Sequence, residues 1–385
     1  MIGVAVVAIK KCPVYEVGRV QEALEEAVAL CGGWERYVRP GDKVLLKGNL
    51  IAPRRPDEAA TTHPEVLRAL VRALKARGCE VSIGDSAGGA IAGLAPTARA
   101  LEVAGWARVC AEEGASLVNF DREGTVPVAS RTGRLVKEFH IARPVREADV
   151  VINVPKLKVH SNGGYTGAVK NTFGCIPGLR KAEYHRLAPS LGEFAELIAD
   201  IHLACRVTLS VLDAIEGMEG AGPTNGTPKK VGLLLASPDP LALDTVAATM
   251  IGLDPAGLDM LQAAARLGVG QGDPGRIRVV GDFGQPPKVE FALPPSVVKG
   301  RRRRTPRWLL PALIAFFKTR PEIDLQRCKR CGICRGSCPV KAIDQEMRID
   351  RSACIECLCC QELCPQGAVS LRRVNPVARR LIPLR

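Results

Sequence analysis

The feature that most constrains this 385-residue chain is a cysteine pattern near its C-terminus that occurs twice. The pattern C-x2-C-x2-C-x3-C-P covers residues 328–339 and again residues 354–365, at a fixed offset of 26 positions. Flanking residues repeat as well, because Ile323-Asp324 corresponds to Ile349-Asp350. A tandem repeat this regular indicates duplication of one small supersecondary unit. The spacing itself is the one that holds a [4Fe–4S] cluster on four thiolates.

Two clusters are predicted, with crossed ligand sets. Three cysteines at short intervals surround one cluster, and the fourth, placed before the proline, reaches the other cluster. The predicted ligands of the first cluster are Cys328, Cys331, Cys334 and Cys364, and those of the second are Cys354, Cys357, Cys360 and Cys338. The segment resembles bacterial two-cluster ferredoxins, which implies a small α+β fold that carries electrons.

Two other uses of these cysteines fit less well. A structural zinc site pairs two C-x2-C elements across a gap, and a disulfide framework is typical of small secreted chains. Eight ligands in this spacing match neither. Cys359 would break the spacing if it replaced Cys360, so we expect Cys359 to be a small buried side chain beside the cluster.

The remaining cysteines and the N-terminus favour a cytoplasmic protein. Outside the repeat, six cysteines are scattered without metal-ligand spacing, which fits a reducing compartment. The N-terminal MIGVAVVAIKK is predicted to be a first strand and not a signal peptide. No stretch approaches the ~20 apolar residues of a membrane span.

Positive charge is concentrated at the C-terminal end. Residues 301–385 hold 19 Lys or Arg against 7 Asp or Glu, while the whole chain has a net charge of +14. Part of this charge offsets the cluster thiolates, and the rest suits an acidic redox partner protein. Binding of nucleic acid is not expected, because the basic residues lack interleaved aromatic side chains and no DNA-binding motif is present.

Residues 1–300 alternate apolar runs with amphipathic stretches. This alternation predicts an α/β domain with a largely parallel sheet. We expect a basic and apolar linker over 301–322, the ferredoxin-type domain over 323–375 and a basic tail over 376–385. The linker is expected to pack the two domains together. Contact of residues 301–318 with a membrane surface is the alternative, disfavoured because Pro311 weakens a continuous surface helix.

The richest polar stretch of the large domain covers residues 153–178, NVPKLKVHSNGGYTGAVKNTFGCIPG. It follows a buried strand, so its polar residues should emerge at the carboxyl edge of the sheet, where open α/β sheets bind ligands. Thr166 is expected to cap a helix whose N-terminus favours an anion. The predicted catalytic residues here are Lys156, His160 and Lys170, and the predicted ligand-binding residues are Lys158, Thr166 and Asn171. A solvated lysine-rich loop is the alternative.

Further candidates follow other strands. Lys47 comes at the end of the second predicted strand, and Asp85 and Ser86 lie in GDSAGG after the third. All three are predicted to contact the ligand, with Lys47 and Asp85 facing the lysines. Among the acids Asp213, Glu219, Asp239 and Asp244, Glu219 is the preferred acid–base candidate and Asp239 is expected to be a turn or cap residue.

Nine motifs taken in order give the large domain a family resemblance: KCPVYE, KGNL, TTHPEV, GDSAGG, PKLKVH, TGAVKN, FGCIPG, DAIEGMEGAGP and SPDPLALD. They resemble domain of unknown function 362, whose members are often fused to a C-terminal two-cluster ferredoxin. The resemblance covers residues 1–290 and specifies a family without specifying a reaction.

Three functions are compatible with this organisation. The first is an iron–sulfur oxidoreductase that passes electrons between a redox partner and an anionic small molecule. The second is a non-catalytic electron-transfer or redox-sensing protein whose large domain docks a partner. The third, a metal or cofactor carrier, is the weakest because the five histidines lack paired spacing. Convergence of Lys156, His160, Asp85 and Glu219 in one pocket favours the first function.

Overall fold

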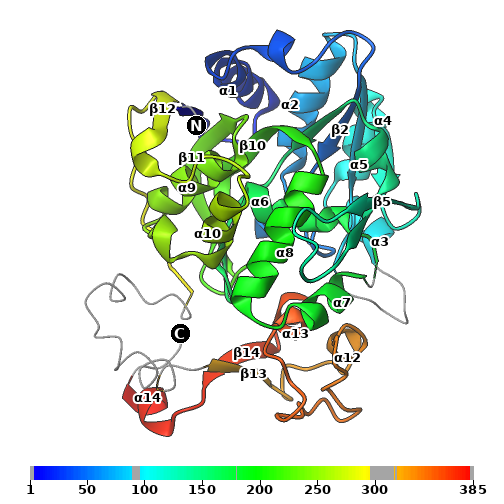
Figure 1. Ribbon diagram of the computed structural model, residues 1–385, viewed down its shortest axis with the longest axis vertical. Helices are drawn as coiled ribbons and strands as arrows, with labels where there is room; N and C mark the ends of the chain where they lie inside the picture. Colours follow the sequence, from blue (N-terminus) through cyan, green and yellow to red (C-terminus); the bar gives the residue numbers. More distant parts are fainter. Residues whose placement is uncertain (1–3, 89–95, 179, 295–315, 317–318, 382–385) are drawn as a thin grey trace.

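A mixed ten-stranded sheet organises the large domain (Figure 1). Its strand order is β12-β1-β11-β10-β7-β2-β3-β4, with β8 beside β10 and β9 beside β8. The structure, a computed structural model, describes residues 4–88, 96–178, 180–294, 316 and 319–381. The strands are β1 (Ala5–Lys11), β2 (Lys43–Lys47), β3 (Glu80–Asp85), β4 (Ser116–Asn119), β7 (Val150–Asn153), β8 (Lys156–His160), β9 (Gly164–Thr166), β10 (Val207–Glu219), β11 (Thr227–Ser237) and β12 (Ile277–Gly281).

Most neighbouring strands run parallel, which confirms the predicted fold class. β2 pairs parallel with both β3 and β7, and β7 continues parallel to β10. β11 is the exception, because it runs antiparallel to both β1 and β10. The stretch 153–178 is not a plain loop, since β8 and β9 form an antiparallel pair at the end of β7.

Helices cover both faces of the sheet because successive strand residues point to opposite faces. In β2, Val44 and Leu46 pack into one apolar core and Leu45 into the other. The helices of the first core are α1 (Val17–Leu30), α2 (Pro64–Lys75), α3 (Thr97–Val103) and α4 (Trp106–Glu113). Those of the second are α5 (Arg143–Glu147), α6 (Ala168–Asn171), α7 (Arg180–Leu187), α8 (Leu191–Ala204), α9 (Pro240–Met250) and α10 (Asp259–Arg266), with the hairpin β5 (Thr125–Ala129) and β6 (Glu138–Ala142) beside them.

Helix starts follow local sequence signals in part. Ser190 and Glu193 form a capping box at the start of α8, a pattern that the sequence itself contains. At α2 the cap is His63, whose Nδ1 accepts from the backbone N–H of Glu65. The preceding residue, Thr62, accepts from the N–H of Asn49 and donates to the carbonyl of Val154, so it joins two strand ends.

The C-terminal segment is a small unit beneath the large domain (Figure 1, orange to red). It consists of β13 (Thr319–Ile323), α12 (Ile333–Gly336), α13 (Cys359–Glu362), β14 (Val369–Arg373) and α14 (Pro376–Leu381). β13 begins inside the range expected for the linker and pairs antiparallel with β14. Most of the basic and apolar linker, residues 301–315, lies outside the described residues. Within the described ranges, no helix has the length and apolar character needed to cross a bilayer.

The two halves of this segment repeat in backbone geometry as well as in sequence. The N–H of Asp324 donates to Ala368 and that of Asp350 donates to Ala342, each at 2.8 Å. Lys341 and Gly367, which correspond across the repeat, both have φ near +55° (54° and 56°). The duplicated cysteine pattern therefore folds as two matching loops.

Candidate functional site

A cavity of about 110 Å³ lies where the carboxyl ends of the central strands meet the C-terminal segment. Its volume exceeds the roughly 10–15 Å³ that one water molecule needs. Polar residues of the large domain line it: Asn49, Asp85, Ser86, Lys158, Thr166, Lys170, Asn171, Lys181 and His185. The C-terminal segment contributes Ser337, Cys359, Glu362 and Leu363. Six of the ten residues predicted for a large-domain site therefore lie together in one cavity.

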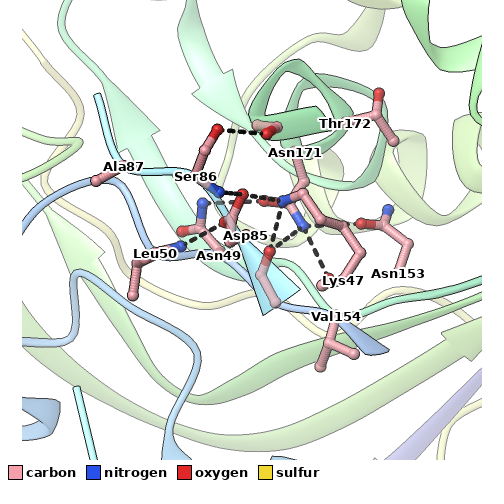
Figure 2. A network of polar contacts seen from close by, with 12 residues as sticks. Lys47, Asn49, Leu50, Asp85, Ser86, Ala87, Asn153, Val154, Asn171 and Thr172 are labelled. Carbon is pink, nitrogen blue, oxygen red and sulfur yellow. Dashed lines mark hydrogen bonds and ion pairs between the residues drawn. The ribbon is translucent and has the colours of Figure 1, made fainter. Parts of the chain in front are cut away.

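The floor of the cavity is a buried ion pair between adjacent parallel strands (Figure 2). Lys47 ends β2 and Asp85 ends β3, and Lys47 Nζ lies 2.9 Å from Asp85 Oδ1. Asp85 also accepts from the N–H groups of Leu50 and Ser86, at 2.9 and 2.7 Å. Gly174 permits this packing, because a Cβ there would lie 2.3 Å from Asp85 Oδ1. Lys47 therefore pairs with Asp85 and does not line the cavity, although the sequence predicts that Lys47 contacts the ligand.

The Asn171 side-chain amide ties α6 to the strand ends. It donates to the carbonyl of Gly48 at 3.0 Å and to Asn153 Oδ1 at 2.8 Å. Its own Oδ1 accepts from Asn49 Nδ2 at 3.0 Å (Figure 2). Such a network fixes the orientation of the cavity wall, because each amide has only one arrangement that satisfies its partners.

Three lysines of the cavity differ in their surroundings. Lys158 is buried and donates to the carbonyl of Ala60 at 2.7 Å, and burial, reinforced by the charge of Lys170, lowers its pKa well below the ordinary value. Lys181 donates to the carbonyls of Ser86 and Ala87, and burial lowers its pKa to about 8. Lys170 is half-buried.

His160 does not line the cavity itself but lies next to Glu362 of α13, which does. His160 Nε2 lies 3.0 Å from Glu362 Oε1, and its Nδ1 accepts from the N–H groups of Asn162 and Gly163. Burial lowers the pKa of His160, with the charge of Lys170 acting in the same direction. Burial alone would raise the pKa of Glu362, but His160 and Lys170 lower it to about 2.

Lys156 does not converge with the other lysines, contrary to expectation. Its Nζ lies 2.9 Å from Asp213 Oδ2 and donates to the Tyr15 hydroxyl at 2.6 Å. Tyr15 also donates to Asp213 Oδ1 and stacks on His63 with ring centroids 3.5 Å apart. Although Lys156 and Lys158 point to the same side of β8, the register pairs Lys156 with Asp213 on β10. Lys156 therefore belongs to a separate buried network.

Two further expectations are corrected. Thr166 lines the cavity but does not cap α6, because Asp244 accepts from the first N–H groups of that helix, at Ala168 and Val169. Burial raises the pKa of Asp244 to about 7. Glu219 lies outside the cavity and accepts from the N–H of Ala292. Asp239 is the N-cap of α9, as predicted.

The eight cysteines of the repeat gather in two groups that coincide with the predicted ligand sets. One cavity is lined by Cys328, Cys331, Cys334 and Cys364, and the other by Cys338, Cys354, Cys357 and Cys360. Backbone N–H groups of Ala342 and Ala368 donate to the sulfurs of Cys338 and Cys364, each at 3.2 Å. Such N–H contacts suit thiolates that hold an iron–sulfur cluster.

A mononuclear site is not supported. Over the part of the chain that the structure describes, no three His, Cys, Asp or Glu side chains are grouped as ligands of a single metal ion. Structural zinc sites require four such ligands in tetrahedral arrangement. The sequence spacing C-x2-C-x2-C-x3-C in each half is instead the spacing of ligands to a [4Fe–4S] cluster. Cys359 is buried and lines both the second cysteine cavity and the polar cavity.

The C-terminal segment is attached to the large domain by hydrogen bonds from α13. Gln361 Nε2 donates to Ser161 Oγ at 3.1 Å, and Asn225 Nδ2 donates to the carbonyl of Gln361 at 2.8 Å. Thr224 donates to the carbonyl of Glu362. These contacts place Glu362 at the cavity and bring the second cysteine group next to it.

Sequence reasoning missed Glu362, Lys181 and His185. Glu362 had a signal, because the corresponding position of the first repeat is Gly336 and a new acid there is not required by the cysteine pattern. Lys181 and His185 lie on α7, a polar helix in which nothing distinguishes them from solvated residues. Burial lowers the pKa of His185 to about 4.

Comparison with known proteins finds two families. The domain of unknown function (DUF362) matches residues 44–249, and the 4Fe-4S binding domain matches residues 321–344. A thylakoid-associated protein of Synechocystis sp., sll1697, is 37% identical over 262 residues, which are 66% of this chain and 77% of that protein. Among solved structures, the lactate racemase apoprotein from Thermoanaerobacterium thermosaccharolyticum has a TM-score of 0.37 at 11% identity. That likeness covers 62% of this chain and only 57% of the racemase chain.

Proposed function

Because this chain belongs to the DUF362 family and carries a 4Fe-4S binding domain, we propose that it is an iron–sulfur oxidoreductase. In this proposal it passes electrons between a redox partner protein and an anionic small molecule bound in the polar cavity. The 4Fe-4S binding domain implies iron–sulfur electron transfer. We propose in addition that the chain binds two clusters, that a redox partner protein exchanges electrons with them, and that a small molecule occupies the cavity.

The two cysteine groups support a count of two clusters. Cys328, Cys331, Cys334 and Cys364 would hold one [4Fe–4S] cluster, and Cys338, Cys354, Cys357 and Cys360 the other. When bound, each cluster accepts and releases one electron. The free cysteines elsewhere in the large domain are buried, which supports placing the protein in a reducing compartment such as the cytoplasm.

One observation carries the proposal: the polar cavity is walled by both the large domain and the cysteine-rich segment. Cys359 lines this cavity and also the second cysteine group. A ligand in the cavity is therefore separated from that group by a single layer of residues. A carrier that only relays electrons to another protein has no need of an enclosed polar cavity at this place.

The residues of the cavity have distinct proposed roles. Lys170 binds the anionic group of the ligand, and Asn171 orients the wall that the ligand contacts. Lys158 holds or moves a proton, because burial lowers its pKa well below the ordinary value and so favours the neutral amine. His160 is a positioning residue that holds Glu362.

A second candidate is a non-catalytic electron-transfer or redox-sensing protein. Lys156 and Glu219 lie outside the cavity, so the four residues whose convergence would favour an enzyme do not all meet there. In that case a partner protein would bind the large domain, and small molecules would not accept electrons from the protein. The two candidates therefore differ in a directly measurable reaction.

The experiment is anaerobic reoxidation of dithionite-reduced protein by a panel of small carboxylates and phosphate esters. We expect one chemical class to reoxidise the protein at a rate that saturates with concentration. At low concentration of the compound, Lys170→Met should be reoxidised at least about tenfold more slowly than the wild type, because the substitution removes a charge-assisted contact. Lys43→Met is the matched control, because Lys43 is exposed at the start of β2. If no compound reoxidises the protein faster than buffer, the docking candidate replaces the oxidoreductase.

A further inference from the structure

We infer that the ligand of the cavity carries a hydrogen-bond donor, a hydroxyl or an amine, next to its anionic group. Glu362 from the C-terminal segment recognises this donor. The inference rests on the proposed anionic ligand and adds the second functional group, which defines a hydroxy acid or an amino acid as the ligand class.

Among the described residues that line the cavity, one cation is free to bind an anion. Among the residues that the structure describes, no carboxylate lies within ion-pair distance of Lys170 Nζ, and this lysine lines the cavity. The other two lysines are engaged, Lys158 by the carbonyl of Ala60 and Lys181 by the carbonyl of Ala87. Lys170 is thus the contact for the anionic group.

Glu362 offers an acceptor that its protein partner does not saturate. Since His160 Nδ1 accepts from two backbone N–H groups, the hydrogen-bond network assigns the ring proton to Nε2, which faces Glu362 Oε1 at 3.0 Å. No other donor from the described residues reaches this carboxylate, and its side chain is only 14% exposed. A carboxylate has about four acceptor positions, and leaving them unfilled in a buried site is costly.

Asn49 also lines the cavity. Its Oδ1 is buried and has no hydrogen-bond partner within the described part of the chain, while its Nδ2 is bound to Asn171. Among the described lining residues, the cavity therefore combines an unpaired cation, Lys170, with the unsaturated carboxylate of Glu362 and an amide that has an unsatisfied acceptor. A simple carboxylate satisfies only the cation, and a second anionic group would be repelled by Glu362. A hydroxy acid or an amino acid satisfies the cation with its carboxylate and satisfies Glu362 with its hydroxyl or amine.

The tandem repeat supports a role for Glu362 outside the cysteine sites. The position corresponding to Glu362 in the first half is Gly336, within the same turn of α12. The cysteine arrangement therefore forms without an acid at this position. The acid is present in the half whose helix α13 is hydrogen-bonded to the large domain.

The test uses three acids that differ in one group: butyrate, 2-hydroxybutyrate and 2-aminobutyrate. Binding to anaerobic full-length protein with its clusters is measured by calorimetry. We expect the hydroxy and amino acids to bind about tenfold more tightly than butyrate, the gain of one charged hydrogen bond. In Glu362→Gln the preference for 2-aminobutyrate over butyrate should shrink to about twofold or less, as the ligand's ammonium no longer meets a negative charge. Glu346→Gln, an exposed acid of the same segment, should leave the preference intact.

The outcomes separate this inference from the proposed function. If all three acids bind the wild type equally and Lys170→Met weakens each of them, the donor inference is wrong and the anionic ligand stands. If none of the acids binds the wild type, both proposals fail. Iron content and thermal stability of Glu362→Gln are measured first. If that variant loses its clusters, the ratio of the wild-type affinities for the substituted acids and for butyrate decides the donor inference.

Discussion

Replacing Cys331 with serine is expected to remove about half of the iron, from about eight to about four atoms per chain, because one of two [4Fe–4S] clusters loses a ligand. Cys331 lines the same cavity as Cys328, Cys334 and Cys364, and it is the exposed member of that group. Iron and sulfide analysis of anaerobically reconstituted protein measures the loss. The second cluster should remain, since its predicted ligands line a different cavity.

The matched control for this substitution is Cys359→Ser. Cys359 lies within the repeat and is buried beside the second group, yet the predicted spacing excludes it as a ligand. We expect Cys359→Ser to keep the full iron content. Iron unchanged in Cys331→Ser, or lost in Cys359→Ser, contradicts the ligand assignment.

Replacing Lys156 with methionine is expected to lower the free energy of unfolding by about 3–5 kcal/mol, the typical cost of leaving one partner of a buried ion pair without its counter-charge. Lys156 and Asp213 have fully buried side chains 2.9 Å apart. Chemical denaturation monitored by circular dichroism measures this change. Loss of ligand binding without loss of stability would place Lys156 in the site instead.

Two variants control the Lys156 experiment. Lys43→Met removes an exposed lysine at the start of β2, in the same sheet, and should change stability by less than about 0.5 kcal/mol. The double variant Lys156→Met with Asp213→Asn removes both charges and should recover part of the loss. A double variant no more stable than Lys156→Met argues that the hydrogen bond to Tyr15 dominates.

The sequence predicts those parts of the site that depend on strand order and spacing. Lys47 and Asp85 both end strands, and because β2 and β3 are parallel neighbours the two side chains meet. The cysteine groups follow from a repeat whose geometry is determined within some 40 residues. In both cases the partners are either local in sequence or brought together by a regular sheet.

The rest depends on contacts between residues far apart in the chain. Lys156 and Lys158 are equivalent by alternation in β8, and only the approach of Tyr15 and Asp213 separates their roles. Thr166 fails as a cap because Asp244, from α9, reaches the same N–H groups first. Local sequence propensity carries no information about a competing group that tertiary packing brings from another part of the chain.

Above all, we claim that an anion binds between the large domain and the C-terminal segment. The most direct measurement is anaerobic native mass spectrometry of the wild type and Lys170→Met in the presence of 2-hydroxybutyrate. We predict one bound molecule on the wild type and none on Lys170→Met, with about eight iron atoms on both. Equal retention by both proteins, or no binding to the wild type, would contradict the claim.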